Sequence, residues 1–95
     1  MGQKARYRPR RLAAKLLQIR QSLGLSQSQL LRSLNLDMSA ARISEYESGE
    51  REPSLLTLLA YGYLVGVSTD KLIDDAENLP ARIRIKRRRK QVTLL

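Results

Sequence analysis

The stretch LSQSQLLRSLNLDMSAARISEYESGEREPS, residues 25–54, contains two short apolar patterns, each preceded by a serine. Gln29 stands three residues after Ser26, which is the spacing of a capping box, so a helix is predicted to begin at Ser26. Asn35 is predicted to end this helix, because asparagine tolerates the left-handed backbone conformation. The predicted buried side consists of three leucines, Leu30, Leu31 and Leu34.

The second pattern predicts another helix, from Ser39 to Ser48. Ser39 is the expected N-cap, and Gly49 provides a natural end. Ile43 and Tyr46 stand three residues apart, so they share one face, which is predicted to be buried. The opposite side presents polar groups, and their purpose is the main question that this sequence raises.

The flanking sequence predicts three further helices, which makes the fold class all-α with five helices. One helix covers residues 9–23, with Pro9 in its first turn and Gly24 after its end. Another begins after Ser54, carries several leucines and ends at Gly66. A short fifth helix begins after Ser68, with Asp70 in its first turn. Its predicted buried residues are Leu72 and Ile73.

The chain has 95 residues, enough for one small domain, predicted at residues 9–79 between tails at 1–8 and 80–95. The tail segment RIRIK, residues 82–86, alternates like a strand edge, but its basic density favours disorder. There is no cysteine and no histidine, which excludes a disulfide framework, a thiolate metal site and a Cys–His catalytic pair. No phosphate-binding loop occurs, so neither an enzyme nor a cofactor nor a metal is predicted. The carboxylates Asp74, Asp75 and Glu77 fit a solvated helix end.

The net charge of +9 lies entirely in the two ends of the chain. Residues 1–11 contribute +5 and residues 81–95 contribute +7, whereas the six basic and nine acidic residues between them give −3. Basic ends attract polyanions, above all nucleic acid. The alternative is that they are solvated tails that aid solubility. No apolar run approaches transmembrane length, so the sequence suggests a cytoplasmic location without membrane contact.

Three sequence pieces, GLSQ, RISEYESG and PSLLTL…GVS, follow one another at a familiar spacing between Leu12 and Ile73. Through these three pieces the chain resembles the Cro and phage-repressor type of helix-turn-helix domain, which is also called the xenobiotic response element family. The resemblance implies a lambda-repressor-like fold that binds double-stranded DNA in a prokaryotic or phage setting. It also implies a recognition helix from Ser39 to Ser48, seated in the major groove.

The resemblance assigns roles residue by residue. The positions that would face base edges are Ala40, Ala41, Arg42, Ser44 and Glu45. Backbone contacts are expected from Gln27, Ser39, Ser48, Arg51 and from basic residues of the ends, namely Arg10, Arg11, Lys86, Arg87, Arg88, Arg89 and Lys90. Arg20 and Glu47 match a pair that forms an internal salt bridge in many members. In the groove, Arg42 can donate to guanine, and Glu45 can accept from cytosine or brace Arg42.

The sequence departs from the family pattern at three places. The turn before Ile43 is two residues longer than usual, and Leu31 stands where a small residue is common. We expect the longer turn to open the helix crossing enough to admit that leucine. Glu45 and Glu50 stand where basic or neutral residues are commoner, and each would repel phosphate unless it meets a donor.

Two functions follow from this sequence. The first is a sequence-specific transcriptional regulator, most simply a repressor, that binds a palindromic operator as a homodimer. Its dimer surface is expected at the short fifth helix, around the apolar residues Leu72, Ile73 and Leu79. The second is an antitoxin-like or other protein-interaction module built on the same fold.

Overall fold

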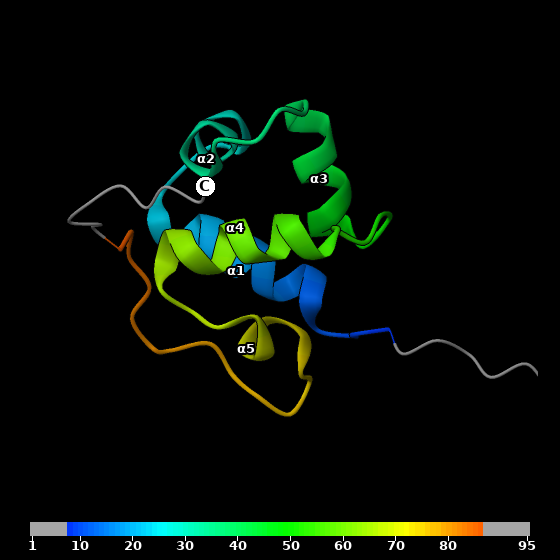
Figure 1. Ribbon diagram of the computed structural model, residues 1–95, viewed down its shortest axis with the longest axis vertical. Helices are drawn as coiled ribbons and strands as arrows, with labels where there is room; N and C mark the ends of the chain where they lie inside the picture. The colour runs from blue at the N-terminus through cyan, green and yellow to red at the C-terminus, as the bar shows by residue number, and fades with distance from the viewer. Residues whose placement is uncertain (1–7, 87–95) are drawn as a thin grey trace, which may run out of the picture.

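Five helices follow one another close to the positions that the sequence predicts. The computed structural model describes residues 8–86 (Figure 1). Within that range the regular elements are all helical, which confirms the all-α prediction. In chain order they are α1 (Leu12–Leu23), α2 (Gln27–Leu34), α3 (Ala40–Ser48), α4 (Leu55–Val65) and α5 (Thr69–Ile73).

Serine caps and left-handed residues set most of the helix ends. The capping box at Ser26 is confirmed, because its hydroxyl accepts from the Gln29 amide and the Gln29 side chain accepts from the Ser26 amide. Ser54 caps α4 in the same way by accepting from the amide of Thr57. Asn35 has a φ of +58°, the left-handed conformation expected of it. Gly66, the predicted end of α4, is left-handed too, so local sequence chemistry sets both ends of α2 and of α4.

The start of the first helix differs from the prediction. The helix α1 begins at Leu12, and Pro9 lies before it rather than in its first turn. Arg11 occupies the N-cap position without a side-chain cap. A distant carboxylate instead holds the chain just before the helix, because Asp75 accepts from the backbone amides of Arg10 and Arg11 at 3.0 Å. No local pattern indicates a contact with a residue 64 positions away.

The core forms where α1 packs against α3 and α5 while α2 packs against α3 and α4. Its fully enclosed members come from every helix, and they are Leu16, Ile19, Leu30, Ile43, Tyr61 and Leu72. Ile43 and Tyr46 are buried, as predicted, so one face of α3 is fixed against the domain. The longer turn contributes as well, because Met38 packs partly into this core and its sulfur accepts from the Tyr46 hydroxyl.

Two expectations about burial are wrong in part. Leu31 and Ile73, predicted to be buried, are only half-buried, because each lies at the edge of the core. The fifth helix also lacks the exposed apolar surface that was expected for a dimer contact. Leu72 is completely enclosed, and Leu79 packs partly against the core. Within residues 8–86 the exposed leucines lie on α4 instead.

A buried lysine fastens the end of α5 to α1. Lys15 is 2% exposed, and its ammonium group donates to the backbone carbonyls of Lys71 at 2.6 Å and Asp74 at 2.9 Å. Burial is the main cause that lowers the pKa of Lys15 below its ordinary value. These carbonyls stand at the end of a helix, where the negative end of the helix dipole favours a cation.

After Pro80 the described chain, residues 80–86, forms no strand and returns to the domain. Ile83 packs partly against the core, and the backbone amide of Lys86 donates to the carbonyl of Leu64 at 2.7 Å. None of the helices within residues 8–86 is both long and apolar enough to cross a membrane.

Candidate nucleic-acid interface

The exposed side of α3 is small and polar. Ala41, Ser44 and Ser48 are exposed, and Ala40 is half-buried. The helix stands at one edge of the molecule, with its outer side open to solvent (Figure 1). Because short side chains let a helix approach base edges closely, this face suits insertion into a major groove.

The inner side of α3 is fixed to α1 by the expected ion pair. Arg20 Nε lies 2.7 Å from Glu47 Oε2, and Arg20 Nη2 lies 3.0 Å from Glu47 Oε1. Only 5% of the Glu47 side chain is exposed. The hydrogen bond to Glu47 is the main cause that raises the pKa of Arg20. This bidentate geometry sets the position and rotation of α3 against the domain.

Gln27 joins the same cluster from the first turn of α2. Its side-chain amide nitrogen donates to Glu47 Oε1 at 3.1 Å. The amide group carries two hydrogens, so one remains to donate to a phosphate at the positive end of α2. The sequence indicated the phosphate role but not the bond to Glu47.

Glu45 lies between two arginines. Its Oε1 accepts a hydrogen bond from Arg51 Nε at 2.8 Å and lies 3.5 Å from Arg42 Nε. The backbone amide of Arg51 also donates to the Glu45 carbonyl, so the turn after α3 folds back on the helix. The sequence indicated that Glu45 could brace Arg42 and that Arg51 could contact DNA, but not that Glu45 and Arg51 bond to each other, because they stand six positions apart across a glycine turn. The three side chains form a group of net charge +1.

The serines at the two ends of α3 differ in what their hydroxyls do. Ser39 is the N-cap residue by backbone conformation, but its hydroxyl makes no capping bond. Ser48 donates its hydroxyl to the Glu45 carbonyl and accepts from the Glu50 amide. Ser48 therefore closes the helix end, and it could donate to a phosphate only by giving up the bond to Glu45.

The N-terminal segment lies beside the far end of α3. Arg8 and Arg51 line one small cavity of about 50 Å³, and Gly49 faces the Ala13 side chain. The dark blue start of the described chain accordingly lies on the α3 side of the molecule (Figure 1). Arg8 was not among the residues that the sequence singled out for DNA contact, since it lies far from Arg51 in the chain.

Arg11 is exposed, but its guanidinium is bonded to the chain after α5. Its Nη1 donates to the carbonyls of Asp75 and Glu77, and its Nη2 donates to Asn78 Oδ1 at 2.8 Å. These bonds use three of the five N–H donors of the guanidinium, so two remain to donate to a phosphate. Arg10, whose backbone binds Asp75, keeps an exposed side chain.

Asp75→Asn is expected to destabilise the protein at neutral pH and to lose that effect in acid. The amides of Arg10 and Arg11 lower the pKa of Asp75 below its ordinary 3.8. A lowered folded-state pKa contributes stability that is complete above the unfolded pKa and is lost as pH falls through the folded one. Thermal melts between neutral pH and about pH 2 measure this, with Asp37→Asn as control. A difference that persists in acid would contradict the carboxylate's role.

The predicted backbone contacts are not all brought to one side. Lys86 lies beside Ser33, Asn35 and the end of α4, and it lines a cavity of about 320 Å³ there. In Figure 1 this orange segment is on the side opposite α3. Arg87, Arg88, Arg89 and Lys90 lie outside the described residues.

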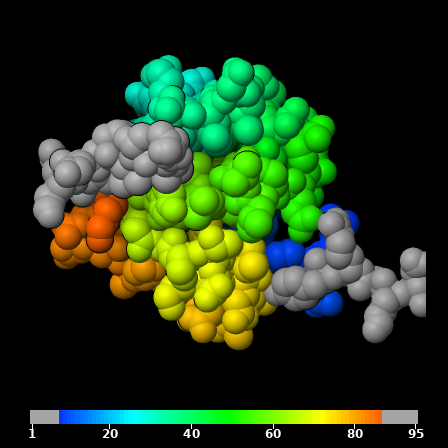
Figure 2. Space-filling model, viewed as in Figure 1, coloured from blue at the N-terminus to red at the C-terminus, as the bar shows by residue number. Residues whose placement is uncertain are grey.

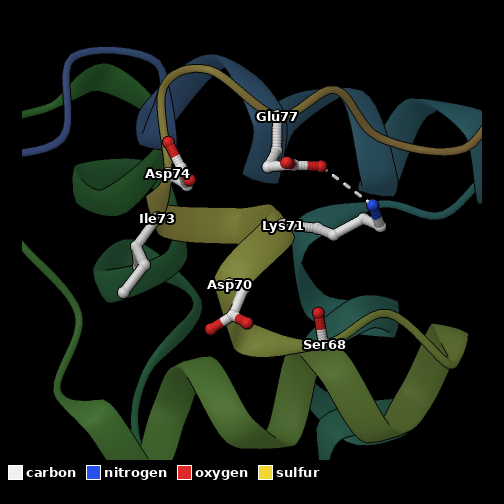
Figure 3. Close-up of a pocket in the computed structure, with 6 residues that line it drawn as sticks. All are labelled: Ser68, Asp70, Lys71, Ile73, Asp74 and Glu77. Carbon is white, nitrogen blue, oxygen red and sulfur yellow. Dashed lines mark hydrogen bonds and ion pairs between the residues drawn. The ribbon is translucent and has the colours of Figure 1, made fainter.

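The acidic residues around α5 surround an open hollow of about 640 Å³ (Figure 3). Two of its carboxylates, those of Glu77 and Asp74, have structural partners. Glu77 accepts from the Lys71 ammonium at 2.9 Å, and Asp74 accepts from the amide of Ala76. Within residues 8–86 no three acidic side chains are grouped so that they could hold a metal ion.

One comparison with known proteins, that with protein families, agrees with this geometry. Neither a curated protein nor a solved structure shows a significant match to the chain. A helix-turn-helix family of the Cro and repressor type matches residues 16–72, which is more than half of the chain and includes α2 and α3 whole. The matched segment carries the fixed inner face of α3 and its exposed outer face, and the chain therefore belongs to this DNA-binding helix-turn-helix family.

Proposed function

We propose that this protein is a sequence-specific transcriptional regulator, a repressor, that binds a palindromic operator as a homodimer. The observation that carries the proposal is the division of α3 into two faces. One is locked to α1 through Arg20 and Glu47. The other presents Ala41, Ser44 and the Glu45 group to solvent. A rigid helix with an exposed small and polar face suits reading in the major groove.

The proposed readout follows from the side chains on that face. Ala40 and Ala41 contact thymine methyl groups, and the Ser44 hydroxyl hydrogen-bonds to a donor or an acceptor on a base edge. Arg42 donates to guanine, with its guanidinium oriented by Glu45. The contribution of each good base contact is about 1–3 kcal/mol of discrimination.

The proposed backbone contacts surround this helix. Gln27 and Ser39 donate near its start, and Arg51, Arg8 and Arg10 contact phosphates near its end. Such contacts fix the register on DNA without reading sequence. Lys86 and the following basic residues add affinity for any duplex.

Selection of bound duplexes from a random DNA pool tests the proposal. A regulator yields one enriched, two-fold symmetric sequence, and transcription from a promoter that contains it falls when the protein is added. Binding to a duplex of scrambled sequence is measured across a salt series as a control. A DNA-binding protein loses affinity steeply, with a log–log slope of about −0.9 for each neutralised phosphate. A weak, salt-insensitive signal with no enriched sequence would favour the protein-interaction module instead.

Glu45→Gln is expected to relax base preference where Arg42 contacts the site, by a factor of about ten, or 1.4 kcal/mol. The reason is that a neutral glutamine amide can no longer hold two guanidinium groups by charge. Arg42→Ala should reproduce the loss at the same base pair, and the two changes should not be additive. Binding to every single-base variant of the selected site measures this. Glu50→Gln removes a neighbouring carboxylate and serves as the control. A uniform gain of affinity on all duplexes would contradict the bracing role.

A further inference from the structure

The helix α4 has an apolar stripe on its outer side. Leu55 is 69% exposed, Leu56 74%, Leu59 37% and Tyr63 54%. At 3.6 residues per turn these four positions fall within an arc of about 100°. Figure 2 shows α4, coloured yellow-green, at the middle of the molecular surface rather than beneath it. The stripe therefore forms one continuous apolar strip along the helix.

The stripe has no part in the core of the domain. The inner side of α4 already supplies Leu58, Tyr61 and Val65 to that core. A helix that is apolar all round is normally covered on every side. Contiguous exposed apolar groups on a small soluble domain usually mark an interaction site.

The charges on the chain indicate what covers the stripe. The net charge of +9 is carried by the two ends of the chain, whereas residues 12–80 hold six basic and nine acidic residues. Each of α1, α2, α3 and α5 carries charged residues, but the segment LLTLLAYGYLV of α4 contains none. An uncharged apolar stripe is complementary to itself across a two-fold axis. Among the five described helices, α4 is thus the one that can pair with its own copy without bringing charged helix residues together.

We propose that Leu55, Leu56 and Leu59 of α4 form the surface by which a second copy of this chain binds. This dimer surface adds to the proposed function, and it rests on that function only for the part that concerns DNA. The link to DNA is that α4 begins directly after the turn that follows α3. A two-fold contact at the stripe therefore joins two α3 helices in one dimer, and two half-sites require such a pair.

The size of the stripe predicts a weak dimer. Four side chains exposed to this degree present on the order of 400 Å² per copy. Twice that area is below the roughly 1,200 Å² of a stable interface, so free protein should dimerise only at high concentration. Two half-sites on one duplex raise the effective concentration of each copy, and DNA then completes the dimer.

Sedimentation equilibrium of the full chain up to about 1 mM tests the proposal. We expect self-association that weakens at least tenfold in Leu56→Lys and in Leu56→Ser. Gln18→Lys adds the same charge at an exposed position of α1 and should leave association unchanged. Leu56 is the most exposed of the four, so both variants should fold, and circular dichroism melts check this. Leu55→Ser is a second variant on the same stripe.

DNA binding separates this proposal from the proposed function. On the selected duplex, Leu56→Ser should keep wild-type affinity for one half-site and lose cooperativity between two. A wild-type chain that stays monomeric and fills two half-sites independently overturns the inference. Association that survives both leucine variants but disappears when residues 87–95 are removed overturns it as well. Association through α4 with no DNA binding at all would reject the proposed function and leave this inference standing.

Discussion

Glu47→Ala is expected to lower the free energy of unfolding by about 3 kcal/mol, because it leaves the Arg20 guanidinium partly buried without its partner. The side chains of Arg20 and Glu47 are 18% and 5% exposed, so water replaces the lost bonds poorly. The same change removes the acceptor of Gln27. DNA binding should weaken too, since α3 loses the bond that sets its rotation.

A double-mutant cycle of Arg20→Ala and Glu47→Ala, followed by urea unfolding, measures the coupling between them. The double variant should be much more stable than the sum of two single losses predicts. Glu77→Ala breaks the exposed pair with Lys71, whose side chains are 44% and 45% exposed, and should cost less than about 1 kcal/mol. Strict additivity at Arg20 and Glu47 would show that they do not interact.

Lys15→Ala is expected to cost about 3 kcal/mol, by opening a cavity and leaving two carbonyls without a donor. Those carbonyls belong to Lys71 and Asp74, so the region that should loosen first is the end of α5. Hydrogen exchange of the amides in α5 would locate the loss.

Lys15→Met separates the two causes, because methionine fills the space of the lysine stem but cannot donate. We expect it to recover roughly half of the loss seen with alanine. Gln18→Ala, at an exposed position of the same helix, should change stability by less than about 0.5 kcal/mol. A methionine variant as stable as the wild type would mean that the ammonium group does not fasten α5.

The sequence determined the number of helices, most of their ends and the inward face of α3. These features, such as the Ser26 capping box and the spacing of Ile43 and Tyr46, depend on residues within four positions of each other. They can therefore be predicted from the sequence. The ion pair of Arg20 and Glu47 was predicted from the family resemblance. Local patterns do not indicate it, because its members are far apart in the chain.

Contacts between distant segments decided the rest. Only the packed structure brings Asp75 to the start of α1, Lys15 to the end of α5 and Arg8 to Arg51. The packed structure also decides where the exposed apolar surface lies. The sequence suggested the fifth helix around Leu72, whereas the surface lies on α4. The physical reason is that a leucine-rich helix has more apolar sides than one core can cover. Which side remains exposed depends on the neighbours that fold against it, and no local pattern records that choice.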